Sequence, residues 1–154
     1  MANMDDIDRR LLAELQDEGR ITNVELAQRV GLTAPPCLRR VRALEDEGII
    51  RGYHAELDPA SLGFSIMVFA MVSLKSQAES ALREFEAAMN ELPEVREVHM
   101  LNGEIDFILK IVSRDLQSFQ EFLTSKLTPA PNVASVKTSL TIRNSKNEPG
   151  VPLE

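Results

Sequence analysis

A single change of hydrophobic periodicity divides this sequence of 154 residues into two parts. Before residue 57, apolar side chains recur every three or four positions, which is the spacing of amphipathic helices. After residue 63, strand-like apolar runs alternate with helical patterns. The segment between them, LDPASLG, is rich in turn-forming residues. We therefore expect two domains, residues 1–56 and 64–143, joined by a linker at 57–63 and followed by a C-terminal tail at 144–154.

The first part predicts three short helices in a helix-turn-helix arrangement. They are expected at residues 6–18, 22–31 and 35–48. The turn Gly31-Leu32-Thr33 has the length and the glycine that join two steeply packed helices. Segment 49–54 follows as a short β segment, which is either a wing or merely a hinge strand. This part is expected to be a (winged) helix-turn-helix domain.

Charge is distributed unevenly along the chain. The net charge of −7 argues at first against nucleic acid, because duplex binding depends on neutralising phosphates with Lys and Arg. Between Glu25 and Glu45, however, there is no acidic residue and there are four arginines. A local cationic patch on an acidic protein is therefore expected. Glu45 itself falls near the core side of its helix, where we expect it to pair with an arginine of a neighbouring helix.

Three of these arginines lie on the third predicted helix. A projection at about 100° per residue places Leu38, Val41 and Leu44 on its core side and the arginines on its outer side. Guanidinium groups fork onto guanine in the major groove and also clamp phosphate. A charged helix face is usually only a solvated face, but the helix-turn-helix context favours DNA contact. The candidate DNA-binding residues are Thr33, Pro36, Arg39, Arg40 and Arg42.

The second part predicts the β-α-β-β-α-β order of a ferredoxin-like fold, so that the fold class is α+β. The expected elements are strand 64–74, helix 77–92 with a capping box of Ser76 and Glu79, strands 95–101 and 105–113, helix 114–127 and strand 135–142. Asn102-Gly103 predicts a tight type I′ turn between the middle strands. The first strand is apolar on both faces, so a second copy is expected to cover the sheet, giving a two-fold dimer or a larger even assembly.

Catalytic and metal-binding motifs are absent from the sequence. It contains one cysteine and two histidines, and no G-x-S-x-G, P-loop or H-E-x-x-H motif. His99 can approach Asp106 across the hairpin, but such a pair is more typical of a polar contact than of a ligand set. We expect no enzyme, no metal and no cofactor. With no long apolar stretch and no signal peptide, we expect a cytoplasmic protein that does not contact membranes.

The hairpin sequence offers a site for a small zwitterion. A backbone N–H at Gly103 suits a carboxylate, and the side chain of Asp106 suits an ammonium group. Ser135, Thr138 and Ser139 of the last strand add donors if they lie near. The alternative is that Asn-Gly is only a turn and Asp106 an edge charge, and the residues by themselves favour that alternative.

Several motifs together resemble the leucine-responsive and asparagine-responsive (Lrp/AsnC, or feast/famine) bacterial transcription regulators over nearly the whole chain. These motifs are DIDRRLL at 6–12, GLT at 31–33, PCLRRV at 36–41, LEDEGII at 44–50 and GEIDF at 103–107. The last is similar to the family's G-x-x-D-[YF] effector hairpin. The resemblance implies an N-terminal DNA-binding domain, a ferredoxin-like domain that dimerises and often assembles into tetramers or octamers, and amino-acid binding between dimers.

The resemblance also completes the set of candidate effector residues. They are Leu101, Asn102, Gly103, Asp106, Ser135, Thr138 and Ser139. In one departure, the family's Pro-Gly-Val before the last strand is Pro131-Asn132-Val133 here. Asparagine tolerates the left-handed backbone conformation, so the turn is expected to survive.

The function expected from residues and resemblance together is that of a DNA-binding transcription regulator. It binds an inverted-repeat-like site on double-stranded DNA, and an amino acid or similar small effector changes how its dimers associate. Two alternatives stay open. One is a stand-alone amino-acid-binding or small-metabolite enzyme domain whose helices serve only assembly, and the other is a DNA-organising protein without an effector.

Overall fold

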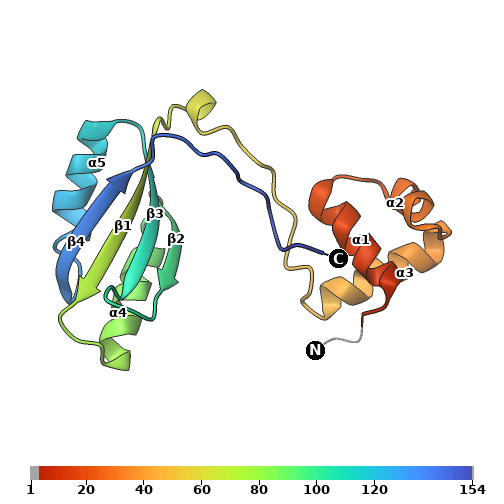
Figure 1. Ribbon diagram of the computed structural model, residues 1–154, viewed down its shortest axis with the longest axis horizontal. Helices are drawn as coiled ribbons and strands as arrows, with labels where there is room; N and C mark the ends of the chain where they lie inside the picture. Colours follow the sequence, from red (N-terminus) through yellow and green to blue (C-terminus); the bar gives the residue numbers. More distant parts are fainter. Residues whose placement is uncertain (1–3, 154) are drawn as a thin grey trace. The chain divides into compact units, whose positions relative to one another are not determined.

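The chain folds as two units, which are described separately (Figure 1). The computed structural model describes residues 4–153. One unit, called the helical unit here, comprises the residues up to Glu56 together with the segment that begins at Lys146. The other, called the sheet unit, is Leu57–Ser145. The C-terminal segment therefore packs with the helices, although the sheet unit precedes it in the sequence.

The helical unit contains the three predicted helices. They are α1 (Asp6–Asp17), α2 (Asn23–Val30) and α3 (Ala34–Asp46). The Asp5 side chain accepts a hydrogen bond from the backbone N–H of Asp8, and the Asp8 side chain accepts one from the backbone N–H of Asp5, so α1 begins with a full capping box. Gly31 ends α2 in the left-handed conformation, with φ of 75°. The buried core consists of Leu11, Leu26, Ala27, Val30, Cys37 and Val41.

Three expectations for this unit are wrong. Leu38 is 38% exposed, because the core stripe of α3 follows Cys37 and Leu38 lies about 100° around the helix from it. Glu45 is exposed and accepts a hydrogen bond from the Tyr53 hydroxyl at 2.8 Å rather than from an arginine. Segment 49–54 contains no strand, so within the described residues it is neither a wing strand nor a hinge strand.

The sheet unit has the ferredoxin-like topology that the sequence predicts. After a 3-10 helix (Ala60–Leu62), its elements are β1 (Ile66–Leu74), α4 (Glu79–Asn90), β2 (Val95–Met100), β3 (Phe107–Ser113), α5 (Leu116–Phe122), a π-helical turn (Leu123–Leu127) and β4 (Val133–Leu140). The strands are antiparallel in the order β2-β3-β1-β4. Helices α4 and α5 cover one face of the sheet, where the ring centroids of Phe85 and Phe107 lie 4.9 Å apart.

The strand register separates a helix-covered face from an open face. On β1, the buried residues Val68, Ala70 and Val72 alternate with residues that face away from the helices. Apolar side chains remain partly exposed on that open face of β1 and β3, namely Met67, Phe69, Met71, Ile108 and Val112. Both faces of β1 are therefore apolar, as expected, but residues 4–153 cover only one of them.

Two predicted turn features of this unit are wrong, and one is confirmed. Neither Asn102 nor Gly103 has positive φ, so the hairpin is not closed by a type I′ turn. Ser76 does not cap α4, which begins after Ala78 without a side-chain cap. Asn132 has φ of 63°, the left-handed conformation that was expected where the resembling family has glycine.

Candidate functional site

Helix α3 is held against the rest of the helical unit at its first residue. The side-chain amide of Asn23, at the start of α2, donates a hydrogen bond to the Ala34 carbonyl at 2.8 Å. Thr33 occupies the N-cap position without a side-chain cap, and it is exposed, while Pro36 is half-buried in the first turn. The start of α3 is thus fixed by a neighbouring helix, and its outer residues face solvent.

The three arginines of α3 have different surroundings. Arg39 and Arg42 are exposed, and within residues 4–153 neither meets a carboxylate at ion-pair distance. Nη1 of Arg40 instead contacts two carboxylates of the α1 capping box, Asp5 Oδ2 at 2.8 Å and Asp8 Oδ1 at 2.7 Å. Arg40 is therefore neutralised inside the fold, contrary to the expectation of three outward-facing arginines.

The capping box and Arg40 form one electrostatic unit, called the Arg40 clamp here. The backbone N–H of Asp8 lowers the pKa of Asp5, and Arg40 lowers it further. In turn, the carboxylates of Asp8 and Asp5 raise the pKa of Arg40. The clamp joins the beginning of α1 to the middle of α3, so it braces the orientation of α3 within the helical unit.

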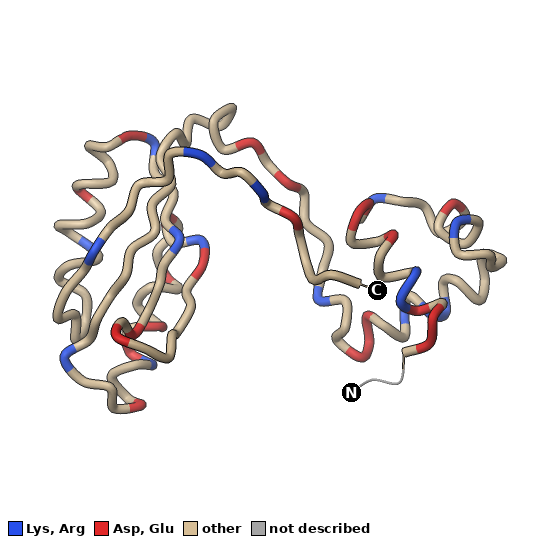
Figure 2. The backbone as a smooth tube through the Cα atoms, viewed as in Figure 1, with Lys and Arg blue, Asp and Glu red and all other residues tan. Residues whose placement is uncertain are grey.

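Arg29 is the fourth arginine of the acid-free sequence window, and it is also neutralised. Its guanidinium group binds Glu14 at 2.9 Å, Glu18 at 2.8 Å and Glu25 at 3.0 Å. Figure 2 shows acidic and basic residues interleaved along the backbone of the helical unit. The cationic patch expected from the sequence is therefore reduced, among the described residues, to the pair Arg39 and Arg42.

The loop between β2 and β3 spans residues 101–106 and is wider than the sequence predicts. It is closed by the backbone N–H of Leu101, which donates to the Asp106 carbonyl at 2.8 Å. Leu101, Asn102 and Gly103 are all exposed. A Cβ atom added at Gly103 would meet nothing within 4 Å, so no packing against the described residues requires glycine at this position.

Asp106 has a structural role at the end of the loop. Its Oδ2 accepts a hydrogen bond from the backbone N–H of Leu74 at 2.6 Å and from Gln77 Nε2 at 3.4 Å. The Asp106 N–H donates to the Val72 carbonyl at 3.0 Å. The carboxylate thus ties the end of β1 to the start of β3. Among the described residues, its other oxygen, Oδ1, has no hydrogen-bond partner.

The predicted donors on β4 are divided between the two faces of the sheet. Ser135 pairs with Ser73 and Ser139 with Phe69, which places both on the open face. Thr138 pairs with buried Ala70 and so lies on the helix-covered face. The fold therefore groups Ser135 and Ser139 but separates Thr138 from them. Ser135 is two strands away from the Asp106 end of β3, roughly 10 Å at the usual strand spacing.

Sequence analysis missed two contacts that matter for these sites. The Arg40 clamp joins residues 32 and 35 positions apart, and only the cap-forming aspartates signalled that carboxylates would lie at the start of α1. Gln77 carried no signal for its contact with Asp106. His99 contacts Glu97 Oε2 at 3.0 Å instead of approaching Asp106.

Residues 4–153 contain no group of three or more His, Cys, Asp or Glu side chains that could hold a metal ion. No described helix is both long and apolar enough to cross a bilayer.

Comparison with known proteins assigns both units. The sequence model of the Lrp/AsnC ligand binding domain matches residues 67–151, and that of a winged helix-turn-helix DNA-binding domain matches residues 4–51. A leucine-responsive regulatory protein of Rhizobium meliloti is 53% identical over 94% of this chain and 92% of its own length. The Bkd operon transcriptional regulator of Pseudomonas aeruginosa is 40% identical over 99% of this chain and 100% of its own length.

Solved structures agree with this assignment. A transcriptional regulator of Neisseria meningitidis in complex with L-Met superposes with a TM-score of 0.93 at 36% identity, covering 98% of this chain and 97% of that one. An AsnC family transcriptional regulator from Agrobacterium tumefaciens gives a TM-score of 0.91 at 29% identity, covering 97% of each chain. With both domains and nearly the full length matched, this chain belongs to the Lrp/AsnC family of DNA-binding transcription regulators.

Proposed function

We propose that this regulator contacts the major groove with α3 and that Arg39 and Arg42 supply its direct contacts to bases and phosphates. The observation that carries the proposal is the exposure of these two guanidinium groups on a helix whose start is fixed by Asn23. A helix of this kind fits the major groove, where an arginine pairs with guanine through two hydrogen bonds. Thr33 and Pro36, at the start of the same helix, approach the DNA backbone that flanks the contacted bases.

Arg40 belongs to the same interface with a different role. Its guanidinium already neutralises part of the charge of two carboxylates, so a phosphate or base would have to compete with both. We assign Arg40 to positioning α3 rather than to reading sequence. The proposed DNA-binding set is therefore the predicted one, divided into contacting residues and a bracing residue.

The effector is proposed to be an amino acid bound at the 101–106 loop. The Neisseria regulator was solved with L-Met, and the sheet unit here belongs to the ligand-binding family. Gly103 leaves its backbone open to a ligand carboxylate, and the second oxygen of Asp106 suits an ammonium group. Leu101 and Asn102 border this loop, and Ser135 and Ser139 lie on the open face of the same sheet. Thr138 lies on the other face and is proposed only as a support for β4.

Assembly is proposed to proceed through the open face of the sheet. Its apolar residues, among them Phe69 at 36% exposure, are buried if the same face of a second copy packs on it. A two-fold dimer presents two α3 helices to an inverted repeat. Further association into tetramers or octamers lets an effector bound between dimers change how many half-sites are engaged, which is allostery by assembly.

The domain roles follow from the same proposal. Residues 1–56 bind DNA, 57–63 link the domains, and 64–143 bind the effector and dimerise, while 144–154 form the C-terminal tail. The protein acts in the cytoplasm on double-stranded DNA and has no catalytic role.

Random-sequence DNA selection, run with and without amino acids, tests this proposal. We expect an enriched motif with two-fold symmetry whose occupancy changes when the correct amino acid is added. An absence of any motif would favour the stand-alone ligand-binding or enzyme domain. An enriched motif that no amino acid affects, combined with no heat in calorimetric titration against the twenty amino acids, would favour a DNA-organising protein.

A further inference from the structure

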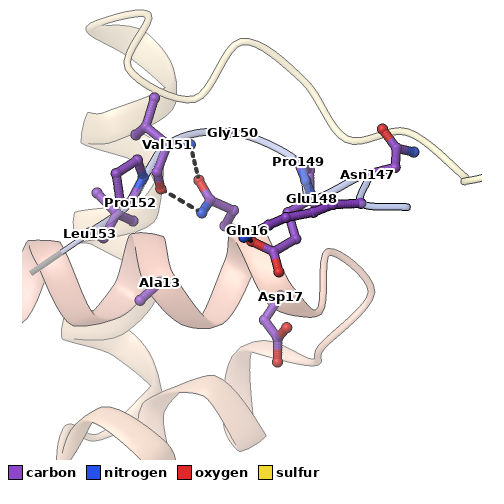
Figure 3. A pocket seen from close by; sticks show the side chains of 11 residues that line it. Ala13, Gln16, Asp17, Asn147, Glu148, Pro149, Gly150, Val151, Pro152 and Leu153 are labelled. Atoms are coloured by element: carbon purple, nitrogen blue, oxygen red, sulfur yellow. Dashed lines mark hydrogen bonds and ion pairs between the residues drawn. The ribbon is translucent and has the colours of Figure 1, made fainter. Parts of the chain in front are cut away.

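The C-terminal segment docks on the outer side of α1. The side-chain amide of Gln16 makes two hydrogen bonds to the backbone of Val151, with Nε2 donating to the carbonyl at 2.8 Å and Oε1 accepting from the N–H at 3.1 Å (Figure 3). One glutamine side chain thus pairs with both backbone polar groups of Val151, as a neighbouring β-strand would. Ala13 and Asp17 of α1 line the same cavity, of about 710 Å³, together with the segment from Lys146 to Leu153.

Gly150 is required for this contact on two independent grounds. Its φ of 71° lies in the left-handed region that side chains disfavour. In addition, a Cβ atom at this position would overlap with the Gln16 side-chain amide. The contact with Gln16 therefore depends on the backbone conformation at Gly150, and it uses no side chain of the C-terminal segment.

A second contact holds the segment farther back along the chain. Asn147 Nδ2 donates to Glu56 Oε1 at 3.2 Å, at the point where the helical unit passes into the linker. Residues 51–58, which lead from the helical unit into the linker, are exposed and contain no helix or strand before the 3-10 helix Ala60–Leu62. The ligand-binding domain match extends to residue 151, so this segment is continuous in sequence with one domain and packed on the other.

We propose that residues 146–153 are a strap, which by docking on α1 gives the helical unit a second point of attachment and restricts its orientation. The inference rests on the proposed DNA-binding function. A second attachment restricts the orientation of each helical unit before DNA binds. Two helical units that bind two half-sites together then lose less orientational entropy. Two hydrogen bonds at exposed positions are weak enough to open, so the strap is a reversible element that binding events in the sheet unit can bias.

The experiment compares Gly150→Ala with Val151→Ala in the full chain. The first change removes the glycine that the contact needs, whereas the second alters an exposed side chain and keeps the backbone bonds. Binding is measured at fixed salt to the selected duplex with two half-sites and to a duplex with one. We expect Gly150→Ala to weaken two-site binding by about fivefold or more, the lower end of usual site-to-site coupling, with one-site binding unchanged. Val151→Ala is expected to leave both unchanged.

Amide hydrogen exchange at Val151 reports the docked strap without DNA. We expect slow exchange in the unaltered chain and in a control variant, Val24→Ala, and faster exchange in Gly150→Ala and Gln16→Ala. Equal exchange in all four proteins would overturn the proposal, as would equal losses of one-site and two-site binding in Gly150→Ala, or no loss at all. If the unaltered chain enriches no DNA motif, the proposed function fails, and this inference fails with it. Failure of the proposed function is distinguishable from failure of the strap, because the exchange data still show whether the segment docks on α1.

Discussion

At Arg40, one guanidinium group is shared by two carboxylates of another helix, and this single residue changes how the DNA interface is understood. Helical projection correctly placed Arg39 and Arg42 on the outer side of α3. It could not place Arg40, because the partners Asp5 and Asp8 are more than 30 positions away and a one-helix projection contains no information about a neighbouring helix. The same limit explains the wrong expectation for Glu45.

The Arg40 clamp is tested by comparing Arg40→Ala with Asp8→Asn. If Arg40 braces α3, Arg40→Ala removes the brace, and Asp8→Asn weakens it while the contact to Asp5 remains. We then expect both changes to lower the Tm of the helical unit and to weaken binding to specific and scrambled duplexes alike, Asp8→Asn by less. If Arg40 instead reads a base, Asp8→Asn releases it toward the DNA and specific affinity is maintained or rises. Calorimetric melting and binding at fixed salt distinguish the two outcomes.

Tyr53 offers a spectroscopic test of the Glu45 contact. Burial first, and the Glu45 carboxylate second, raise the pKa of Tyr53 from 10.0 to about 12. Because the folded-state pKa is the higher one, the stabilisation is complete below pH 10 and is lost as the pH rises through about 12. The chain has one tyrosine and no tryptophan, so ultraviolet absorbance of the phenolate reports this residue alone.

In that titration we expect a midpoint near pH 12 for the unaltered chain. Glu45→Gln should lower the midpoint while keeping it above the ordinary value, because burial is the larger cause. A midpoint at the ordinary tyrosine value in the folded protein, with circular dichroism showing that the helices persist, would contradict the contact.

Among the elements, the periodic ones were predictable and the connecting ones were not. Apolar spacing located three helices and the β-α-β-β-α-β order, because each buried stripe is written locally in the sequence. The 101–106 loop was mispredicted, because the Asn102-Gly103 pair favours a tight turn locally whereas Asp106 is held by the N–H of Leu74 on another strand. A contact of that kind depends on register across the sheet, which local sequence does not contain.

This loop supplies a prediction about the effector site. Asp106→Ala removes an acceptor for the Leu74 N–H, and we expect it to lower the unfolding free energy of the sheet unit by about 1–3 kcal/mol. Gly103→Ala adds a methyl group where nothing lies within 4 Å, so stability should change little. If a ligand carboxylate approaches this backbone, Gly103→Ala nevertheless weakens amino-acid binding. Calorimetric titration measures amino-acid binding, and thermal melting measures stability, in both variants and in the unaltered chain. Unchanged ligand binding in Gly103→Ala would place the effector site elsewhere.

At the scale of the whole molecule, the open sheet face is the feature that a single chain leaves incomplete. Sequence alternation on β1 predicted this face correctly, because both of its sides are apolar and only one can meet the helices. Phe69 lies on it, partly exposed. What the sequence could not predict is that the chain returns from β4 to the helical unit, since the docking of residues 146–153 depends on one glycine conformation and one glutamine.

Assembly through this face is tested with Phe69→Lys. In a two-fold interface, the introduced lysine is buried close to the same lysine of the second copy, and the two like charges repel. We therefore expect the variant to sediment as a monomer and to lose binding to two-site DNA. Its helix content should match that of the unaltered chain, since Phe69 does not face α4 or α5. Arg83→Ala, at a solvent-exposed position of α4 on the opposite side of the sheet, provides the control. Sedimentation of Phe69→Lys as the unaltered assembly would exclude this face.

The central claim, that exposed guanidinium groups on α3 recognise DNA, is tested most directly by the affinity of Arg39→Ala and Arg42→Ala for the selected duplex and for a scrambled one at the same salt concentration. We expect a base-reading arginine to cost about 1–3 kcal/mol on the selected duplex and little on the scrambled one, and a phosphate-binding arginine to weaken both equally. If both variants bind both duplexes as tightly as the unaltered chain, α3 is not the DNA-recognition element.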